Sequence, residues 1–198
     1  MPKKNKMVDA HFKMLWSDAI PKYSNTDSNG KKIEVEVMAG SLENHKAPSP
    51  PPNSWAADPN NEVAIWNIQL EAGAQWTMPK ASAGINRTIY YYEGDEINLA
   101  GKKITKYHAV EVHAEFDISL VNGNTAARIL VLQGRPINEP VMQYGPFVMN
   151  TKEEINQAFE DYHNTQFGGW PWKRGDQVHD RHAGRFAIHA DGTKEVKS

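Results

Sequence analysis

Short runs in which apolar and polar residues alternate constrain the fold of this 198-residue chain more than any other feature of its sequence. Ile33, Val35 and Val37 alternate with glutamates, which places the three apolar side chains on one face of a β-strand. Asn122 and Gly123 separate two further runs, and this dipeptide is a strong hairpin signal. Many short strands at regular spacing are typical of a β-sandwich or a β-barrel. The other strands are expected at residues 62–70, 74–78, 86–92, 103–107, 115–121 and 126–132.

One helix is expected after the strands. Thr151 and Glu154 have the spacing of a capping box, in which each residue's side chain accepts a hydrogen bond from the other's backbone N–H. Apolar residues then recur at helical spacing from Ile155 to Tyr162. The pattern predicts a helix over about 152–163 whose apolar stripe docks on the barrel.

The polar and proline-rich stretches divide the chain. Residues 1–30 are polar and broken by turn residues, which predicts a linker or arm. Residues 31–163 hold the strands and the helix, and residues 164–198 read as an irregular tail. The prolines of 47–54 lack N–H donors, so this segment is expected to be an extended loop outside the sheets.

Composition excludes several classes of protein. The formal net charge of −2 argues against an extended nucleic-acid surface, which needs a basic excess. The chain has no cysteine, and therefore no disulfide framework or thiolate ligand. No apolar run approaches the roughly 18 residues of a membrane span, and the N-terminus lacks the apolar region of a signal peptide. A cytoplasmic protein is expected.

Long irregular strings with tryptophan and proline at fixed places carry a family resemblance. They are PINEPVMQYGPFVMNTKEEINQAFEDY (136–162), FGGWPW (167–172), GRFAIHADG (184–192), SPPPNSWAADPNNEVAIW (49–66) and PKKNKMV (2–8). These strings resemble the C-terminal half of the pirin family. Pirins are bicupins, with two β-barrel domains face to face and a metal in the first.

The resemblance implies an all-β fold: a cupin-like barrel (double-stranded β-helix or jelly roll) with one C-terminal helix and an irregular tail. It also implies that iron or another divalent metal belongs only to the N-terminal domain, so no cofactor is expected in this chain. The segment 2–8 resembles the family's linker between domains, which favours a truncated chain.

The cupin metal motif can be tested against this sequence. It runs G-x5-H-x-H-x3,4-E-x6-G, with a third histidine on a later strand. The H-x-H spacing puts both imidazoles on the inward face of one strand. When the motif is aligned to start at Gly73, its two histidine positions fall on Pro79 and Ala81, and its glutamate position falls on Asn86 or Arg87. Its closing glycine is Gly94, and the third histidine falls near Ile118. None of these residues is an imidazole or acidic ligand, so neither a metal site nor a catalytic residue is predicted here.

The same frame points Arg87 and Tyr91 into the barrel, where they are the candidate residues of an internal pocket. In one interpretation they fill the core, and Arg87 is satisfied by a buried acid or a backbone carbonyl. In the other, Arg87 holds an anion by a charge-assisted hydrogen bond. The sequence leaves both open.

Three functional hypotheses follow from the resemblance. In the first, the chain is a non-catalytic structural or interaction module, which binds a protein partner or itself through an exposed domain face. Its candidate contacts are Leu15, Trp16, Trp170 and Trp172. In the second, it is part of a metal-dependent oxygenase of the quercetin 2,3-dioxygenase type, whose activity comes from another domain. In the third, it is a transcriptional co-regulator that acts through proteins, without direct contact with nucleic acid.

Overall fold

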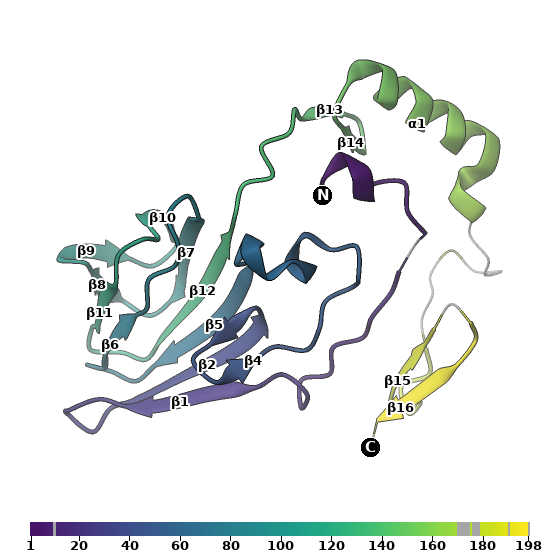
Figure 1. The fold of residues 1–198 in the computed structure, drawn as a ribbon. Helices are drawn as coiled ribbons and strands as arrows, with labels where there is room; N and C mark the ends of the chain where they lie inside the picture. Colours follow the sequence, from purple (N-terminus) through teal and green to yellow (C-terminus); the bar gives the residue numbers. More distant parts are fainter. Residues whose placement is uncertain (10, 170–174, 176–178, 190, 198) are drawn as a thin grey trace. The chain divides into compact units, whose positions relative to one another are not determined.

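The chain forms two compact units, Leu15–Pro136 and a second unit that joins Met1–Met14 to Ile137–Ser198 (Figure 1). The computed structural model describes residues 1–9, 11–169, 175, 179–189 and 191–197. Residues 1–30, predicted to be a linker or arm, contribute to both units. No helix in these described ranges combines the length and the apolar character that crossing a bilayer requires.

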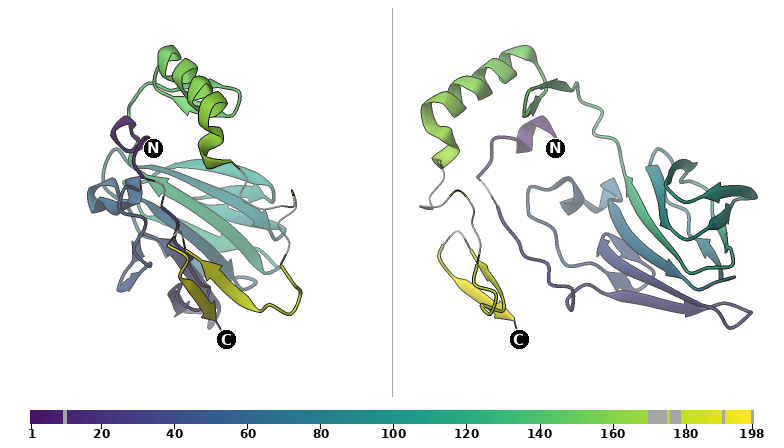
Figure 2. Two further views of the ribbon diagram at one scale, coloured as in Figure 1. Left: turned by 90° about the vertical axis from the view of Figure 1, so that its right-hand side faces the viewer. Right: turned by 180° about the vertical axis from the view of Figure 1, so that it is seen from behind.

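The larger unit contains an antiparallel sheet of six strands, of which two further views are given in Figure 2. Its strands, in spatial order, are β1 (Lys22–Thr26), β2 (Lys32–Ala39), β5 (Ala64–Leu70), β12 (Ala127–Gly134), β7 (Asn86–Glu93) and β10 (His108–His113). Strand β1 lies within the range predicted to be an arm. Only one of its residues, Tyr23, is buried, so the alternation that marks a strand is too weak there to read from sequence.

A second sheet of four strands belongs to the same unit. Its spatial order is β6 (Gln75–Met78), β11 (Ile118–Asn122), β8 (Glu96–Leu99) and β9 (Lys102–Thr105). A short hairpin joins β3 (Ser41–Leu42) to β4 (His45–Lys46). Between β4 and β5 the proline-rich loop stays outside the sheets, as predicted, and leads into two 3-10 helices, Trp55–Ala57 and Pro59–Asn61.

The hydrophobic core takes side chains from both sheets. Register places Tyr23, Val35, Ile68, Ile129 and Tyr91 in one cross-strand row, and all five are buried. Such rows follow from period 2, because every second residue of each strand points to the same face. The prediction of an all-β, cupin-like fold is confirmed, as a sandwich of two sheets rather than one closed barrel.

The smaller unit contains the helix and two hairpins. Its elements are a 3-10 helix (Lys3–Asn5), β13 (Met142–Tyr144), β14 (Phe147–Met149), α1 (Lys152–Thr165), a 3-10 turn (Gln166–Gly168), β15 (Arg185–Ile188) and β16 (Lys194–Lys197). The capping box forms as predicted: the backbone N–H of Glu154 donates to Thr151 Oγ1, and that of Thr151 donates to Glu154 Oε2, both over 3.2 Å.

The apolar stripe of α1 packs on its neighbouring hairpin. The ring of Phe159 meets that of Phe147 edge-on at 4.8 Å between centroids, and Tyr144 at 5.8 Å. Phe167 closes the cluster against Phe147 and Tyr162. These aromatic contacts lie within the smaller unit, because the short hairpin just before the helix offers aromatic side chains that the strand pattern did not reveal. Docking of the stripe on the barrel stays a prediction.

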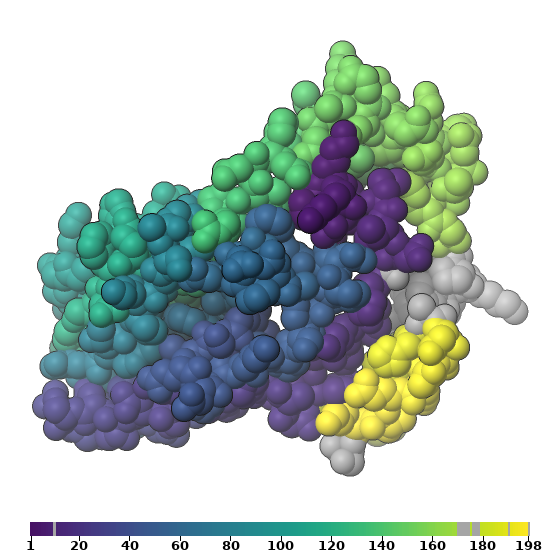
Figure 3. All heavy atoms as spheres, viewed as in Figure 1, coloured from purple at the N-terminus to yellow at the C-terminus, as the bar shows by residue number. Residues whose placement is uncertain are grey.

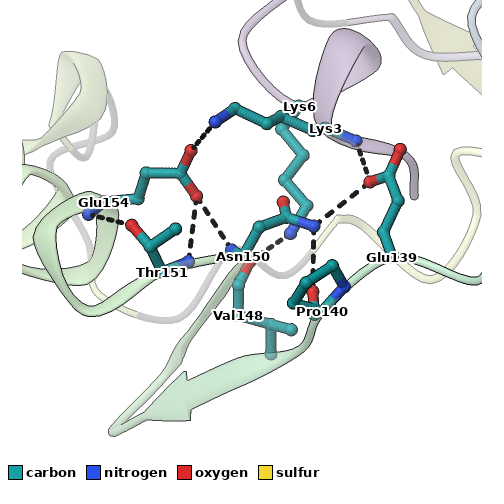
Figure 4. A network of polar contacts seen from close by, with 8 residues as sticks. All are labelled: Lys3, Lys6, Glu139, Pro140, Val148, Asn150, Thr151 and Glu154. Atoms are coloured by element: carbon teal, nitrogen blue, oxygen red, sulfur yellow. Dashed lines mark hydrogen bonds and ion pairs between the residues drawn. The ribbon is translucent and has the colours of Figure 1, made fainter.

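Charged contacts join the N-terminal segment to residues 139–154 (Figure 4). The backbone N–H of Lys3 donates to Glu139 Oε2 over 2.6 Å, and its Nζ lies 2.7 Å from Glu154 Oε1. Lys6 Nζ donates to the carbonyl of Val148. The hydrogen bond from Lys3 lowers the pKa of the Glu154 carboxyl. Lys3 and Lys6 of this segment are therefore paired within the smaller unit.

Candidate functional site

A cavity of about 580 Å³ opens in the larger unit. Residues of the segment 40–66 form most of its wall, and this segment is the blue part of the face shown in Figure 3. Pro79 and Ala81 line it as well, together with Arg87 from β7 and Gln133 from β12. Three positions of the cupin metal motif, Pro79, Ala81 and Arg87, therefore line one cavity. The side chains of Pro79 and Ala81 contain no atom that could bind a metal ion.

Arg87 is placed by the alternation of strand β7. Its side chain points inward with Ile89 and Tyr91, and only 2 % of the residue is exposed. Register pairs it with Gln133, which continues the inward row of Ile129 and Val131 along β12. A polar pair therefore replaces the apolar pairs of the neighbouring rows, at the end of the sheet where the cavity lies.

The guanidinium of Arg87 has few partners. Its Nε donates to Gln133 Oε1 over 2.7 Å, and its Cζ lies 5.8 Å from the ring centroid of Trp66. Gln133 Nε2 donates in turn to the carbonyl of Glu62 over 2.9 Å, which holds the amide oxygen toward the guanidinium. Arg87 Nη1 is buried, and no described residue accepts a hydrogen bond from it.

The cavity wall therefore carries a buried positive charge. Burial lowers the pKa of Arg87, while the carboxylates of Glu62 and Asp117 act in the opposite direction. The ordinary pKa of arginine lies so high that the group stays protonated in proteins. A buried cation with an unused N–H attracts an acceptor, preferably an anionic one.

The other positions of the motif do not supply metal ligands. Asn86 is exposed, and Ile118 is buried without lining the cavity. Within the described part of the chain, no three His, Cys, Asp or Glu side chains group so as to hold a metal ion.

Tyr91 does not share the cavity with Arg87. It lies farther along β7 and does not line the cavity. Its hydroxyl packs against Gly94, so closely that a Cβ at residue 94 would overlap it. The hydroxyl is buried and unpaired among the described residues, and burial raises the pKa of Tyr91. Sequence reasoning thus named one residue of the cavity and one of the core.

Gln133 and Trp66 were missed by sequence reasoning. A signal for Gln133 existed, because a polar residue ends the apolar inward row of its strand. Trp66 looked like any core aromatic, and only register places it beside the row of Arg87.

The predicted partner contacts differ in accessibility. Leu15 is 37 % exposed and Trp16 is half-buried. Trp170 and Trp172 lie outside the described residues.

An apolar strip crosses the outward face of the six-stranded sheet. Leu132 pairs with Ile65, and Leu130 with Tyr90, so the four side chains are neighbours. Tyr90 is 39 % exposed and Leu132 is 38 % exposed. This outward strip, Ile65, Tyr90, Leu130 and Leu132, was not singled out from the sequence, because it needs the register of three strands.

Comparison with known proteins agrees with the fold. Residues 65–168 match the family described as the Pirin C-terminal cupin domain. Pirin-1 of Arabidopsis thaliana is 33% identical over 85% of this chain and 55% of its own length, and human pirin is 29% identical over 82% and 53%. A crystal structure of quercetin 2,3-dioxygenase from Acinetobacter baumannii superposes with a TM-score of 0.69 at 27% identity, covering 85% of this chain and 54% of that one. The chain spans about half the length of the curated relatives that it matches.

Proposed function

The chain belongs to the pirin family, through its C-terminal cupin domain, and on that premise we propose that it is a non-catalytic cupin module that binds another domain. One observation carries the non-catalytic part. The motif's ligand positions hold Pro79, Ala81 and the buried guanidinium of Arg87. A fixed positive charge repels a divalent cation, and proline and alanine side chains offer it no ligand. A cytoplasmic location, predicted from the sequence, is part of this proposal.

The outward strip supports the binding part. Contiguous apolar side chains on an otherwise polar surface mark protein interaction sites. Leu132 and Tyr90 lie at the centre of a regular sheet, so a partner would meet a preformed surface. The proposed occupant is a metal-bearing cupin domain of the pirin type, in the same or another chain. The relatives extend well beyond the part that this chain matches, which leaves room for such a domain in them.

Metal content tests the non-catalytic part. The purified chain is incubated in turn with Fe, Mn, Ni and Zn, dialysed, and analysed by plasma mass spectrometry. We expect a metal-to-protein ratio near zero in each case. A ratio near one that survives dialysis would contradict the proposal, since it would require ligands other than those of the motif.

Self-association tests the binding part, because a free outward strip should pair with a second copy at high concentration. Size-exclusion chromatography with light scattering is expected to show dimers of the unsubstituted chain. Leu132→Asp should give monomers, because it puts a charge into the strip. Thr77→Asp is the matched control, since Thr77 is an exposed residue of β6 in the other sheet. A clean monomer at high concentration would count against the interaction surface.

The likeness to a quercetin 2,3-dioxygenase favours one second candidate, a part of an oxygenase whose metal is held by another domain. In that case the chain alone should leave quercetin unchanged in air, and adding a separate metal-bearing pirin N-terminal domain should start its oxygen-dependent loss. No loss in the mixture would remove this candidate. A role as a transcriptional co-regulator acting through proteins rests on resemblance alone.

A further inference from the structure

The guanidinium of Arg87 donates a hydrogen bond from Nε, whereas its Nη1 has no hydrogen-bond acceptor among the described residues. Gln133 takes the Nε hydrogen bond, while Nη1 is buried with no acceptor among the described residues. Leaving a buried charged donor unpaired costs free energy, because the donor has lost its hydration without gaining an acceptor. Buried polar groups in native proteins nearly always have partners, so each exception calls for an explanation. An acceptor supplied by a ligand in the adjoining cavity is one.

The chemistry of the group selects the ligand's head. A guanidinium presents planar N–H donors that match the two oxygens of a carboxylate. Gln133 is held by its own hydrogen bond to Glu62, so its amide oxygen stays on Nε, and Nη1 has no acceptor among the described residues. The arginine is therefore positioned before a ligand arrives, which lowers the entropy cost of binding.

The charges around the cavity select the ligand's charge. Three cationic and three acidic residues line it: Lys46, Lys80 and Arg87 against Glu43, Asp58 and Glu62. Because the two sets balance, one unpaired N–H favours a single negative charge, and a dianion would be repelled by the acids.

The apolar lining of the cavity favours a ligand whose remaining part is apolar. Trp66 stacks beside the guanidinium, and Ala47, Pro48 and Pro79 add apolar surface. A cavity of about 580 Å³ is large enough for a small organic molecule, and pockets of this kind are mostly apolar with a few polar anchors.

We infer that this cavity binds a small organic monocarboxylate, with Arg87 anchoring the carboxylate and Trp66 packing on the body of the ligand. The inference deepens the proposed function, since the residue that stands in place of a metal ligand becomes the anchor for an anion. The two remain separable, because metal content and carboxylate binding are measured independently.

Calorimetric titration of the full chain tests the inference with benzoate as the probe. Benzamide serves as its neutral analogue and inorganic phosphate as a dianion. Benzoate is expected to bind at one site, and both comparison ligands about tenfold more weakly or worse. Arg87→Met should reduce benzoate affinity by at least about tenfold. Arg128→Met is the matched control, because Arg128 is an exposed arginine of β12 that pairs with Glu93, and it should leave the affinity unchanged.

A second variant covers the case in which Arg87→Met does not fold. Gln133→Glu places a carboxylate of the protein's own beside the guanidinium, and should weaken benzoate binding by a similar factor while keeping the charge of Arg87. The inference would be overturned if benzoate does not bind, if it binds no better than benzamide, or if both variants bind it as tightly as the unsubstituted chain does. Binding of benzoate together with stoichiometric metal would overturn the proposed function and leave the cavity's role standing.

Discussion

Arg87→Met should leave the free energy of unfolding within about 1 kcal/mol of that of the unsubstituted chain, although Arg87 is only 2 % exposed. The substitution removes the hydrogen bond to Gln133, for which a charged donor contributes about 1.5–3 kcal/mol. It also removes the contact with Trp66, which contributes about 0.5–2 kcal/mol.

Two gains offset these losses. Methionine leaves no unpaired Nη1, whose burial costs about 1–3 kcal/mol. It also takes a buried charge out of a cavity wall, and replacing buried ionic groups with apolar ones of similar volume is often neutral or stabilising. The sum is close to zero because the native contacts satisfy the guanidinium only in part.

Urea unfolding followed by circular dichroism measures the difference, with the slope of the transition checking that both proteins unfold in the same way. The control Arg128→Met should also change stability by less than about 0.5 kcal/mol, since exposed ion pairs contribute little. A loss of about 3–5 kcal/mol for Arg87→Met would refute the reasoning, because it is the cost of breaking a fully satisfied buried pair. Arg87 would then be a structural residue of the core.

Three other changes test the fold of the two units. Thr151→Ala removes half of the capping box of α1 and should lower the stability of the helix by about 1 kcal/mol, measured by hydrogen exchange of its first turn. Gly94→Ala should lower the thermal midpoint, because residue 94 has a φ of +125° and a new Cβ would overlap the Tyr91 hydroxyl. Burial raises the pKa of Tyr91, so the folded state favours the neutral phenol. The neutral phenol contributes fully to the free energy of unfolding below the unfolded-state pKa of about 10. This contribution is lost as the pH rises toward and through the higher pKa of the folded state. Tyr91→Phe should therefore lose less stability than the unsubstituted chain in alkaline urea titrations; an equal loss would contradict this account.

Several strands with one buried face were predicted from the sequence, whereas β8 (Glu96–Leu99), in which Ile97 and Leu99 are buried, was not. Strand β5 was predicted at 62–70 and occupies Ala64–Leu70, and β7 was predicted at 86–92 and occupies Asn86–Glu93. Both alternate strictly between buried and more exposed positions, and that alternation is what a period of two detects.

Strand β10, which lacks a fully buried face, was missed, although β9, which also lacks one, was predicted at 103–107 and occupies Lys102–Thr105. In β10 (His108–His113) no residue is fully buried, and two histidines and a glutamate interrupt its apolar positions. It pairs only with β7, at the edge of its sheet, where polar residues are favoured because they discourage association. The sequence carries little period-2 signal at such an edge, so tertiary pairing decides the strand.

Some features of the site could likewise be predicted from the sequence and others could not. The inward direction of Arg87 follows from counting along one strand, and could be predicted. Its partnership with Gln133 depends on the register between β7 and β12, which has a shift between Arg128 and Ile129. A one-residue error in register would have sent Gln133 to the opposite face. The sequence therefore predicted an inward-pointing cation. The cavity, the hydrogen bond to Gln133 and the unpaired Nη1 became visible only in the paired strands.

The same strand geometry can serve two chemistries. In the cupin motif, inward histidines two residues apart converge on a metal ion, which supplies positive charge and can bind further ligands. In this chain Pro79, Ala81 and Arg87 border the corresponding cavity, and the positive charge is covalently part of the protein. A guanidinium attracts and orients anions, but it has no open coordination position and cannot exchange electrons. If the scaffold is used here, we expect its use to be recognition of a carboxylate, which makes benzoate binding and its dependence on Arg87 the decisive observation for this domain.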